Sequence, residues 1–285
     1  MEYSIEAAAE SIAAAGALLI GAGAGMGVDS GLPDFRGTEG FWKAYPPYAR
    51  LGLRFEQVAN PEHFRRDPPM GWGFYGHRRN LYRRTTPHPG FAILQAWGGR
   101  MPGGSFVFTS NVDNHFPKAG FDPDQVYECH GSIEHLQCLG RCGSDIFEAG
   151  PAEVEIDPET FRAVEPLPTC PRCGGLARPN ILMFGDWDWD GGRAREQAHR
   201  LERWLETIRS SRLAVVELGA GTAIPTVRNF CEMTAMELGG TLIRINVRES
   251  EVPPGHLGIA MGALAALEAI EDRLRPSPGE GFQAG

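Results

Sequence analysis

Four of the six cysteines stand in two close pairs, Cys138 with Cys142 and Cys170 with Cys173. Glycines beside each pair favour tight turns around the sulfur atoms. Four thiolates at this spacing can close a tetrahedral zinc site, and such a site leaves no open position for a catalytic water. The sequence therefore predicts one structural zinc per chain, with disulfides or free buried thiols as the alternative. The two remaining thiols, Cys129 and Cys231, are expected in the core.

A glycine-rich stretch follows the apolar residues 17–20. A buried strand that runs into glycines is how α/β proteins bring backbone N–H groups against a phosphate. The dinucleotide fingerprint G-x-G-x-x-G is not met, because Met26 or Val28 occupies its last place. A turn-forming run with Asp34, Phe35 and Arg36 follows instead of a long helix. We interpret this stretch as a nucleotide loop with reactive groups attached. A plain loop is the alternative, and a hydride-transferring dehydrogenase is least expected.

Polar side chains that could act on a nucleotide come directly after two predicted strands. His130 follows a strand at 126–129, and its imidazole suits proton removal near neutral pH. Asn111 and Asp113 follow a strand at 105–109 at alternate positions, so both can point to one side. An amide and a carboxylate so placed suit ribose hydroxyls or a carboxamide. The alternatives are a structural histidine and two residues that only begin a turn.

The elements that must position these groups alternate between buried strands and helices. Strands are predicted at 17–20, 105–109, 126–129, 213–218 and 241–247, and helices at 4–16, 87–97, 193–209, from 225, and at 257–274. This alternation is typical of a doubly wound parallel sheet, whose ligands lie beyond the carboxyl ends of the strands. The residues that follow the strands are therefore expected along one polar rim: Gly21 onward, Ser110 to Asp113, His130, Gly219 to Thr222, and Asn246.

The predicted fold class is α/β, a Rossmann-like doubly wound parallel sheet with a small zinc-binding module and a helical insertion. Residues 1–37, 86–132 and 181–275 are assigned to the Rossmann-like nucleotide-binding domain. The aromatic, proline-punctuated residues 38–85 form the helical insertion, and residues 133–180, which hold the paired cysteines, form the zinc-binding module. Residues 276–285 are expected to be a flexible tail.

Composition limits the partners and the compartment. The chain has 285 residues and a formal net charge of -9, which argues against nucleic acid as a partner. The local cluster Arg78, Arg79, Arg83 and Arg84 is interpreted as a solvated helix face. The sequence holds no apolar run long enough to span a bilayer and no basic segment before an apolar stretch near its start. We expect a cytoplasmic protein with no membrane partner.

Taken together, these motifs resemble the sirtuin family of NAD-dependent protein deacylases, and the chain looks like a divergent bacterial-type member. The resemblance runs in the family's order from Ala17 to about Asn246. Residues 23–25 are similar to the first NAD loop, and the run 30–36 matches the family signature closely. Thr109-x-Asn111-Val112-Asp113 resembles the second motif, and His130-Gly131 resembles the catalytic histidine. The four cysteines look like the structural zinc module of the family.

The resemblance implies a reaction and a set of site residues. His130, Asn111 and Asp113 would be catalytic, and an acyl-lysine protein or peptide would enter near Phe184-Gly185. The products would be deacylated lysine, nicotinamide and O-acyl-ADP-ribose. The co-substrate NAD would be bound by Gly23, Ala24, Gly25, Asp34, Phe35, Arg36, Ser110, Asn111, Asp113, Gly219, Gly221, Thr222 and Asn246, and the zinc by Cys138, Cys142, Cys170 and Cys173.

This chain departs from the family pattern at several positions. Ser110 stands where the family usually has glutamine beside the nicotinamide ribose, and Ala220-Gly221 stands where it has Thr-Ser. Asp186 replaces the usual glutamate after Phe184-Gly185. These departures leave an alternative open, an NAD-dependent protein ADP-ribosyltransferase or NAD glycohydrolase on the same fold. A non-enzymatic module that binds NAD or ADP-ribose is a further, less favoured alternative.

Overall fold

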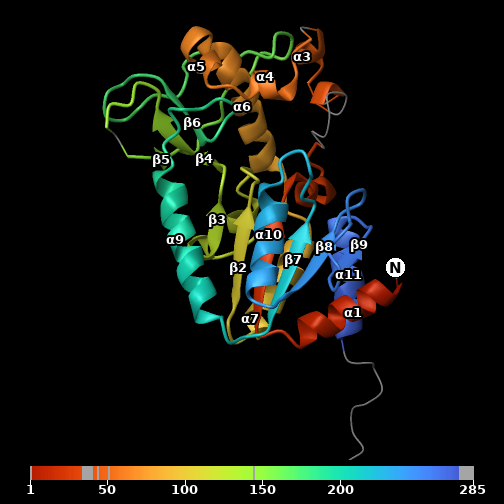
Figure 1. Cartoon of the computed structure of the whole chain (residues 1–285). Helices are drawn as coiled ribbons and strands as arrows, with labels where there is room; N and C mark the ends of the chain where they lie inside the picture. Colours follow the sequence, from red (N-terminus) through yellow and green to blue (C-terminus); the bar gives the residue numbers. More distant parts are fainter. Residues whose placement is uncertain (1, 34–40, 44, 51, 144, 276–285) are drawn as a thin grey trace, which may run out of the picture. The chain divides into compact units, whose positions relative to one another are not determined.

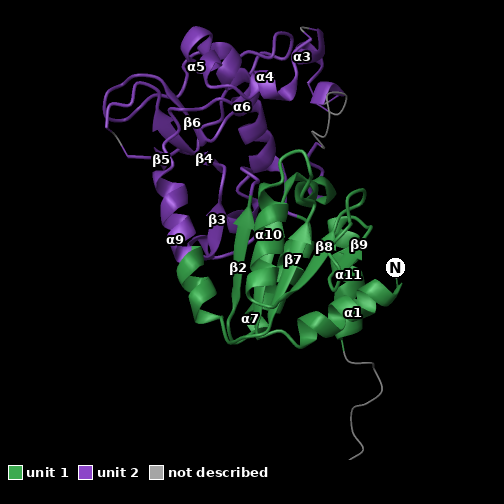
Figure 2. Cartoon of the chain, viewed as in Figure 1, with its two compact units in different colours: residues 1–29, 88–109, 201–285 green, residues 30–87, 110–200 purple. Residues whose placement is uncertain are grey.

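The computed structural model describes residues 2–33, 41–43, 45–50, 52–143 and 145–275. The predicted site residues Asp34, Phe35 and Arg36 lie outside these described residues. The chain forms two compact units, shown in Figure 2. Unit 1 comprises residues 1–29, 88–109 and 201–285, and unit 2 comprises residues 30–87 and 110–200. The finer division into a nucleotide-binding domain, an insertion and a zinc module stays a prediction.

Unit 1 is built around parallel strands (Figure 1). They lie in the order β2-β1-β7-β8-β9, and every neighbouring pair in this series is parallel. This arrangement confirms the predicted Rossmann-like sheet. The bounds are β1 (Ala17–Ala22), β2 (Ser105–Thr109), β7 (Leu213–Leu218), β8 (Thr241–Ile245) and β9 (Leu257–Ile259).

The strands of unit 1 are apolar throughout because they are buried. All six residues of β1 and all six of β7 are buried, as expected for a parallel sheet covered by helices. Helix α10 (Thr226–Glu237) contacts β1, β7 and β8, whereas α7 (Gly90–Arg100) contacts β1 and β2. Helices α1 (Glu2–Ala13) and α11 (Ala263–Leu274) contact each other. No helix in the described part of the chain has the length and apolarity needed to cross a membrane.

The last part of the sequence prediction was wrong in one respect. Residues 257–274 were expected to form one helix, but residues 257–259 pair with β8 as strand β9, and α11 begins at Ala263. The strand has only three residues and lacks the alternation that marks a longer strand. Asp29 accepts a hydrogen bond from the backbone N–H of Leu264 at 2.8 Å, which satisfies one unpaired amide at the start of the helix.

Unit 2 combines short helices with a small antiparallel sheet. The sheet has the order β5-β4-β6 and is formed by β4 (Gly131–Cys138), β5 (Phe147–Glu148) and β6 (Ala177–Ile181). The other elements are α3 (Pro46–Arg50), α4 (Phe55–Val58), α5 (Glu62–Arg66), α6 (Pro68–Arg84), α8 (His115–Lys118) and β3 (Val126–Glu128). Helix α9 (Gly192–Thr207) contains the sequence boundary between the units. Aromatic rings fill the core of unit 2, among them Phe41, Tyr45, Tyr48, Phe64, Trp72, Phe74 and Tyr75.

The arginines of α6 correct another prediction. Arg78 and Arg79 are buried and do not form a solvated face. Arg79 donates to the carbonyl of Ala152 at 2.7 Å and to two other carbonyls of the same loop. Arg78 donates to the hydroxyl of Tyr82 at 2.8 Å and lies over aromatic rings of the core. These arginines therefore stabilise unit 2 from within, which offsets the cost of burying their charge.

Candidate active site and metal centre

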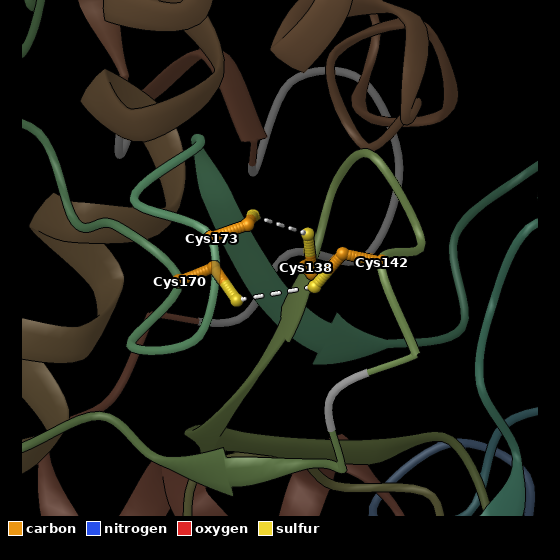
Figure 3. A group of neighbouring side chains, drawn as sticks. All are labelled: Cys138, Cys142, Cys170 and Cys173. Atoms are coloured by element: carbon orange, nitrogen blue, oxygen red, sulfur yellow. Dashed lines mark hydrogen bonds between the residues drawn. The ribbon is translucent and has the colours of Figure 1, made fainter.

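The four paired cysteines meet at one point in unit 2 (Figure 3). Their sulfur atoms all lie within 4.8 Å of one another. The Sγ atoms of Cys138 and Cys173 are 3.7 Å apart, and those of Cys142 and Cys170 are 3.6 Å apart. A tetrahedral zinc with Zn–S bonds of about 2.3 Å has S···S edges of ~3.8 Å. The geometry of the cluster therefore fits zinc.

Local structure explains how the sulfurs converge. Cys138 ends β4, and a turn with Arg141 at φ 50° and Gly143 at φ 78° brings Cys142 back beside it. The second pair flanks a turn in which the N–H of Gly174 donates to the carbonyl of Cys170 at 2.9 Å. The other two thiols are buried elsewhere, and burial raises the pKa of the Cys129 thiol to about 12. Cys129 is therefore an unreactive core residue, as predicted.

The predicted nucleotide loop of unit 1 is fixed against the loop that follows β7. The N–H of Gly23 donates to the carbonyl of Leu218 at 2.9 Å, and that of Gly25 donates to the carbonyl of Gly219 at 3.0 Å. A Cβ atom on Gly23 would lie 2.7 Å from the Cα of Ala220. The glycines thus allow two loops to approach closely, and their amides already have protein acceptors. A pyrophosphate bound at this loop would therefore have to be contacted by groups other than the N–H groups of Gly23 and Gly25.

The loop after β7 is held in turn by Asn246 at the end of β8. The side-chain amide of Asn246 donates to the carbonyl of Ala220 at 2.8 Å, and its oxygen accepts from the N–H groups of Arg248 and Glu249, both at 3.1 Å. The N–H of Thr222 donates to the Glu249 carboxylate at 3.2 Å. The structure therefore brings together the predicted site residues of unit 1 at the carboxyl ends of adjacent strands: Gly23, Ala24, Gly25, Gly219, Gly221, Thr222 and Asn246.

The predicted catalytic residues lie together in unit 2. The backbone N–H of Ile133 donates to the carbonyl of Val112 at 3.0 Å, so the segment with Asn111 and Asp113 runs beside the segment that starts at His130. Burial lowers the pKa of His130, and a hydrogen bond with the backbone of Ser110 partly offsets this effect. His130 is therefore neutral at pH 7 and able to accept a proton.

Asp113 closes a local turn and also lines a cavity. One of its carboxylate oxygens accepts a hydrogen bond from the N–H of His115 at 2.9 Å, which closes the turn at Asn114, whose φ is 61°. Asp113 also lines a cavity of about 600 Å³ with Lys118, His135 and other residues of unit 2. The turn that was the alternative explanation for this carboxylate is therefore present. The residues that line this cavity do not include Asn111 or His130, so the cavity is not evidence for a role of Asp113 in the proposed reaction.

The backbone around His130 is tightly constrained. Gly131 has φ 82°, and a Cβ atom there would lie 2.0 Å from the carbonyl oxygen of Asn180. The N–H of Leu182 donates to the carbonyl of His130 at 2.9 Å. Only glycine fits after the histidine, since a side chain would separate β4 from β6.

Sequence reasoning missed a buried ion pair beside this histidine. Glu128 is buried and pairs with Arg193 at 2.6 Å, and burial raises the pKa of Glu128 against the lowering effect of that arginine. Its backbone N–H donates to the side chain of Gln197 at 3.2 Å. The partners are far apart in the sequence, so no local pattern could have shown the pair.

The fold and these groups define the class of the protein. It combines a parallel α/β sheet and its glycine loops with a second unit that carries a half-buried, neutral histidine and a four-cysteine cluster that fits zinc. The Sir2 family model matches residues 23–201. The chain belongs to the Sir2 family.

Individual relatives agree with this assignment. The chain is 31% identical to NAD-dependent protein deacylase 2 of Pyrobaculum aerophilum over an alignment of 262 positions that covers 89% of this chain and 90% of the relative. It is 29% identical to the NAD-dependent protein deacylase of Aquifex aeolicus over 258 residues, 90% of this chain and 95% of the relative. It is also similar to a crystal structure of a Sir2 homologue in complex with NAD, at 25% identity and a TM-score of 0.68, covering 94% of this chain and 93% of that one.

Proposed function

We propose that the protein is an NAD-dependent protein-lysine deacylase that releases nicotinamide and O-acyl-ADP-ribose. The observation that carries this proposal is the position of His130 in unit 2. Its ring is half-buried, neutral at pH 7 and bonded to the Ser110 backbone, beside the segment with Asn111 and Asp113. Membership of the Sir2 family and relatives named NAD-dependent protein deacylase support the same activity.

Each group has a role that follows from its chemistry. NAD, when bound, supplies an electrophilic ribose carbon and accepts the acyl group. As nicotinamide leaves the ribose carbon, the acyl oxygen of the lysine would bond there. His130 then takes the proton from a neighbouring ribose hydroxyl, whose oxygen bonds to the acyl carbon. The lysine nitrogen leaves that carbon as the free amine, and one water adds to it, which leaves the acyl group as an ester on the ribose. Asn111 and Asp113 orient the ribose and the carboxamide, so that the reacting groups meet without loss of further orientational freedom. The glycine loops of unit 1 bind the remainder of the dinucleotide.

The four cysteines hold zinc in a structural role. They supply four sulfur ligands, which leaves no site for a reacting water. The metal would fix the end of β4, whose first residue follows His130. The expected contribution of zinc is therefore to the folding of unit 2 rather than to the chemical step.

The test is the variant His130→Ala, with His199→Ala as a matched control because His199 is exposed on α9. We expect acyl transfer from an acetyl-lysine peptide to fall by at least ~100-fold in His130→Ala, within the usual range for the loss of a general base. NAD binding should remain, and the control should be unchanged. Mass spectrometry of O-acetyl-ADP-ribose and of free nicotinamide gives the readout. Full activity in His130→Ala would refute the assignment.

Ser110 favours a second candidate function. The family pattern has glutamine at this position, and the shorter serine leaves more room beside the ribose for water or for a protein side chain as the acceptor. The alternative is therefore transfer of ADP-ribose to protein or to water. The same mass spectra separate the two, because added ADP-ribose on protein, or free ADP-ribose, would replace O-acyl-ADP-ribose. Binding of NAD without any release of nicotinamide would indicate a non-enzymatic module.

The partner of this reaction is an acyl-lysine protein or peptide. We place its entry near Phe184-Gly185, because the segment that begins at Leu182 is bonded to the backbone of His130. The expectations of a cytoplasmic location, and of neither nucleic acid nor a membrane as a partner, stay predictions.

A further inference from the structure

Three exposed apolar side chains lie within six residues of one another in unit 2. Leu182 and Phe184 are 39% and 38% exposed, and Trp187 is 95% exposed. They are three of the ten large hydrophobic side chains that are exposed in the described part of the chain. We call Leu182, Phe184 and Trp187 the apolar rim. Single exposed apolar residues are ordinary on a protein surface, but a fully exposed tryptophan in such a group is typical of a contact surface.

The residue before Trp187 is anchored in the core. The carboxylate of Asp186 accepts two hydrogen bonds from Arg178, one of them at 3.1 Å, and both side chains are almost fully buried. The same carboxylate accepts the N–H of Met183 at 3.3 Å, which closes the turn around Gly185. Removing either charge would leave the other buried and unpaired, so this pair fixes the turn strongly.

The residues after Trp187 are anchored as well. The Asp188 carboxylate pairs with Arg65 and, at 3.0 Å, with Arg141. The Asp188 carbonyl accepts from Gln137 at 2.8 Å, and the N–H of Asp190 donates to the same glutamine at 3.1 Å. Trp187 therefore stands on a loop held on both sides. Its exposure is a fixed feature of the fold and does not result from a poorly held segment.

The rim is also continuous with the proposed catalytic histidine. The N–H of Leu182 donates to the carbonyl of His130 at 2.9 Å. Trp187 lies five positions after Leu182 in the sequence, which limits the distance between their backbones to ~18 Å even for an extended chain. The turn at Gly185, with φ 68°, makes the path shorter. A polypeptide whose modified lysine reaches His130 can therefore reach Trp187 with the residues beside that lysine.

We propose that the side chain of Trp187 contacts the polypeptide that carries the acyl-lysine and selects an apolar or aromatic residue near that lysine. This inference rests on the proposed deacylase function. A tryptophan offers a large apolar surface at low cost in side-chain entropy, and its fixed loop lowers that cost further. Such rigid aromatic anchors contribute a large share of the binding energy at protein interfaces. The carboxylates beside Trp187 are neutralised by arginines, so the contact is apolar rather than electrostatic.

The experiment compares Trp187→Ala with the wild type on three substrates. These are an acetyl-lysine peptide with phenylalanine and leucine beside the lysine, the same peptide with glycine at those positions, and a capped single acetyl-lysine. We expect kcat/KM for the apolar peptide to fall about tenfold through KM, a typical loss for an interface tryptophan. For the other two substrates it should change less than twofold. Retained zinc content and an unchanged Tm show that the variant is folded.

The matched control is Tyr3→Ala, which removes an aromatic ring that is 79% exposed in unit 1. It should leave all three substrates unchanged. Equal losses on all three substrates in Trp187→Ala, or no loss on any of them, would overturn the role of Trp187. Self-association of the wild type that disappears in Trp187→Ala would also overturn it, in favour of a second copy of the chain as the occupant. An inactive wild type on every acyl substrate would refute the deacylase function itself, and the two failures are thus distinguishable.

Discussion

His130 shows how the surroundings of one residue prepare it for proton transfer. Burial removes water from the imidazole and lowers its pKa, because the charged form loses its hydration. The hydrogen bond to the Ser110 backbone acts in the opposite direction and orients the ring. The result is a ring that is neutral at pH 7, as a base must be before it accepts a proton.

This environment predicts the pH dependence of the reaction. The pKa of His130 lies below the ordinary value of 6.5, so the base is protonated and inactive only on the acid side of that value. We expect kcat/KM to be constant from pH 7 to 8 and to fall about tenfold per pH unit below the pKa of the histidine. Initial rates of nicotinamide release between pH 5 and 8 would measure this, with zinc content checked at each pH. An acid limb centred above pH 7 would contradict the proposed role.

The loops that follow β1 and β7 are held together by backbone hydrogen bonds. The loop after β1 donates two backbone hydrogen bonds, one to the last residue of β7 and one to the loop that follows it. Asn246, at the end of β8, donates to the carbonyl of Ala220 in that second loop. The two loops lie very close together. Gly219 has φ 59°, and a Cβ atom built on it would lie only 2.4 Å from the Cα of Gly25. The glycines at these positions are therefore required by contact as well as by backbone conformation.

Two glycine substitutions in unit 1 test how much the close contact between these loops contributes to stability. Gly219→Ala should lower the free energy of unfolding by about 2–4 kcal/mol, because left-handed strain adds to an overpacked contact. It should also weaken NAD binding, since the two loops must separate. Gly239→Ala has a similar φ of 61° but open space around it, so only the strain of about 1–2 kcal/mol is expected. Urea unfolding and NAD titration measure both variants. Equal losses of stability in the two variants would show that the close contact contributes nothing.

For the whole molecule, sequence patterns predicted those features that depend on residues close together in the chain. The buried strands, the glycine loops and the paired cysteines are each visible within short windows, and the structure confirms the sheet and the cysteine cluster. Burial of Arg79 was not predictable, because its carbonyl partners lie about seventy residues away. The pairing of Asp188 with Arg65 and Arg141 joins three distant segments in the same way. Asp34, Phe35 and Arg36 match the family signature, and their roles stay predictions.

Because the four cysteines lie in unit 2, loss of zinc is expected to affect the two units differently. The cluster lies entirely in unit 2, and Cys138 ends the strand that begins directly after His130. Loss of zinc should therefore disorder β4 and with it the position of the histidine. Unit 1 has its own buried parallel sheet and holds none of the four cysteines, so it should keep its structure.

We therefore expect about one zinc per chain by elemental analysis, and loss of that zinc in Cys170→Ser or after chelation. Acyl transfer should disappear in both cases, by at least ~100-fold, because the general base is no longer positioned. Amide hydrogen exchange should then rise first in residues 131–138 and 177–181, while β1 and β7 stay protected, since cooperative units open separately. The matched control is Cys231→Ser, which alters a buried thiol of unit 1 outside the cluster and should retain zinc. A folded, fully active protein without metal would contradict the structural role of the four cysteines.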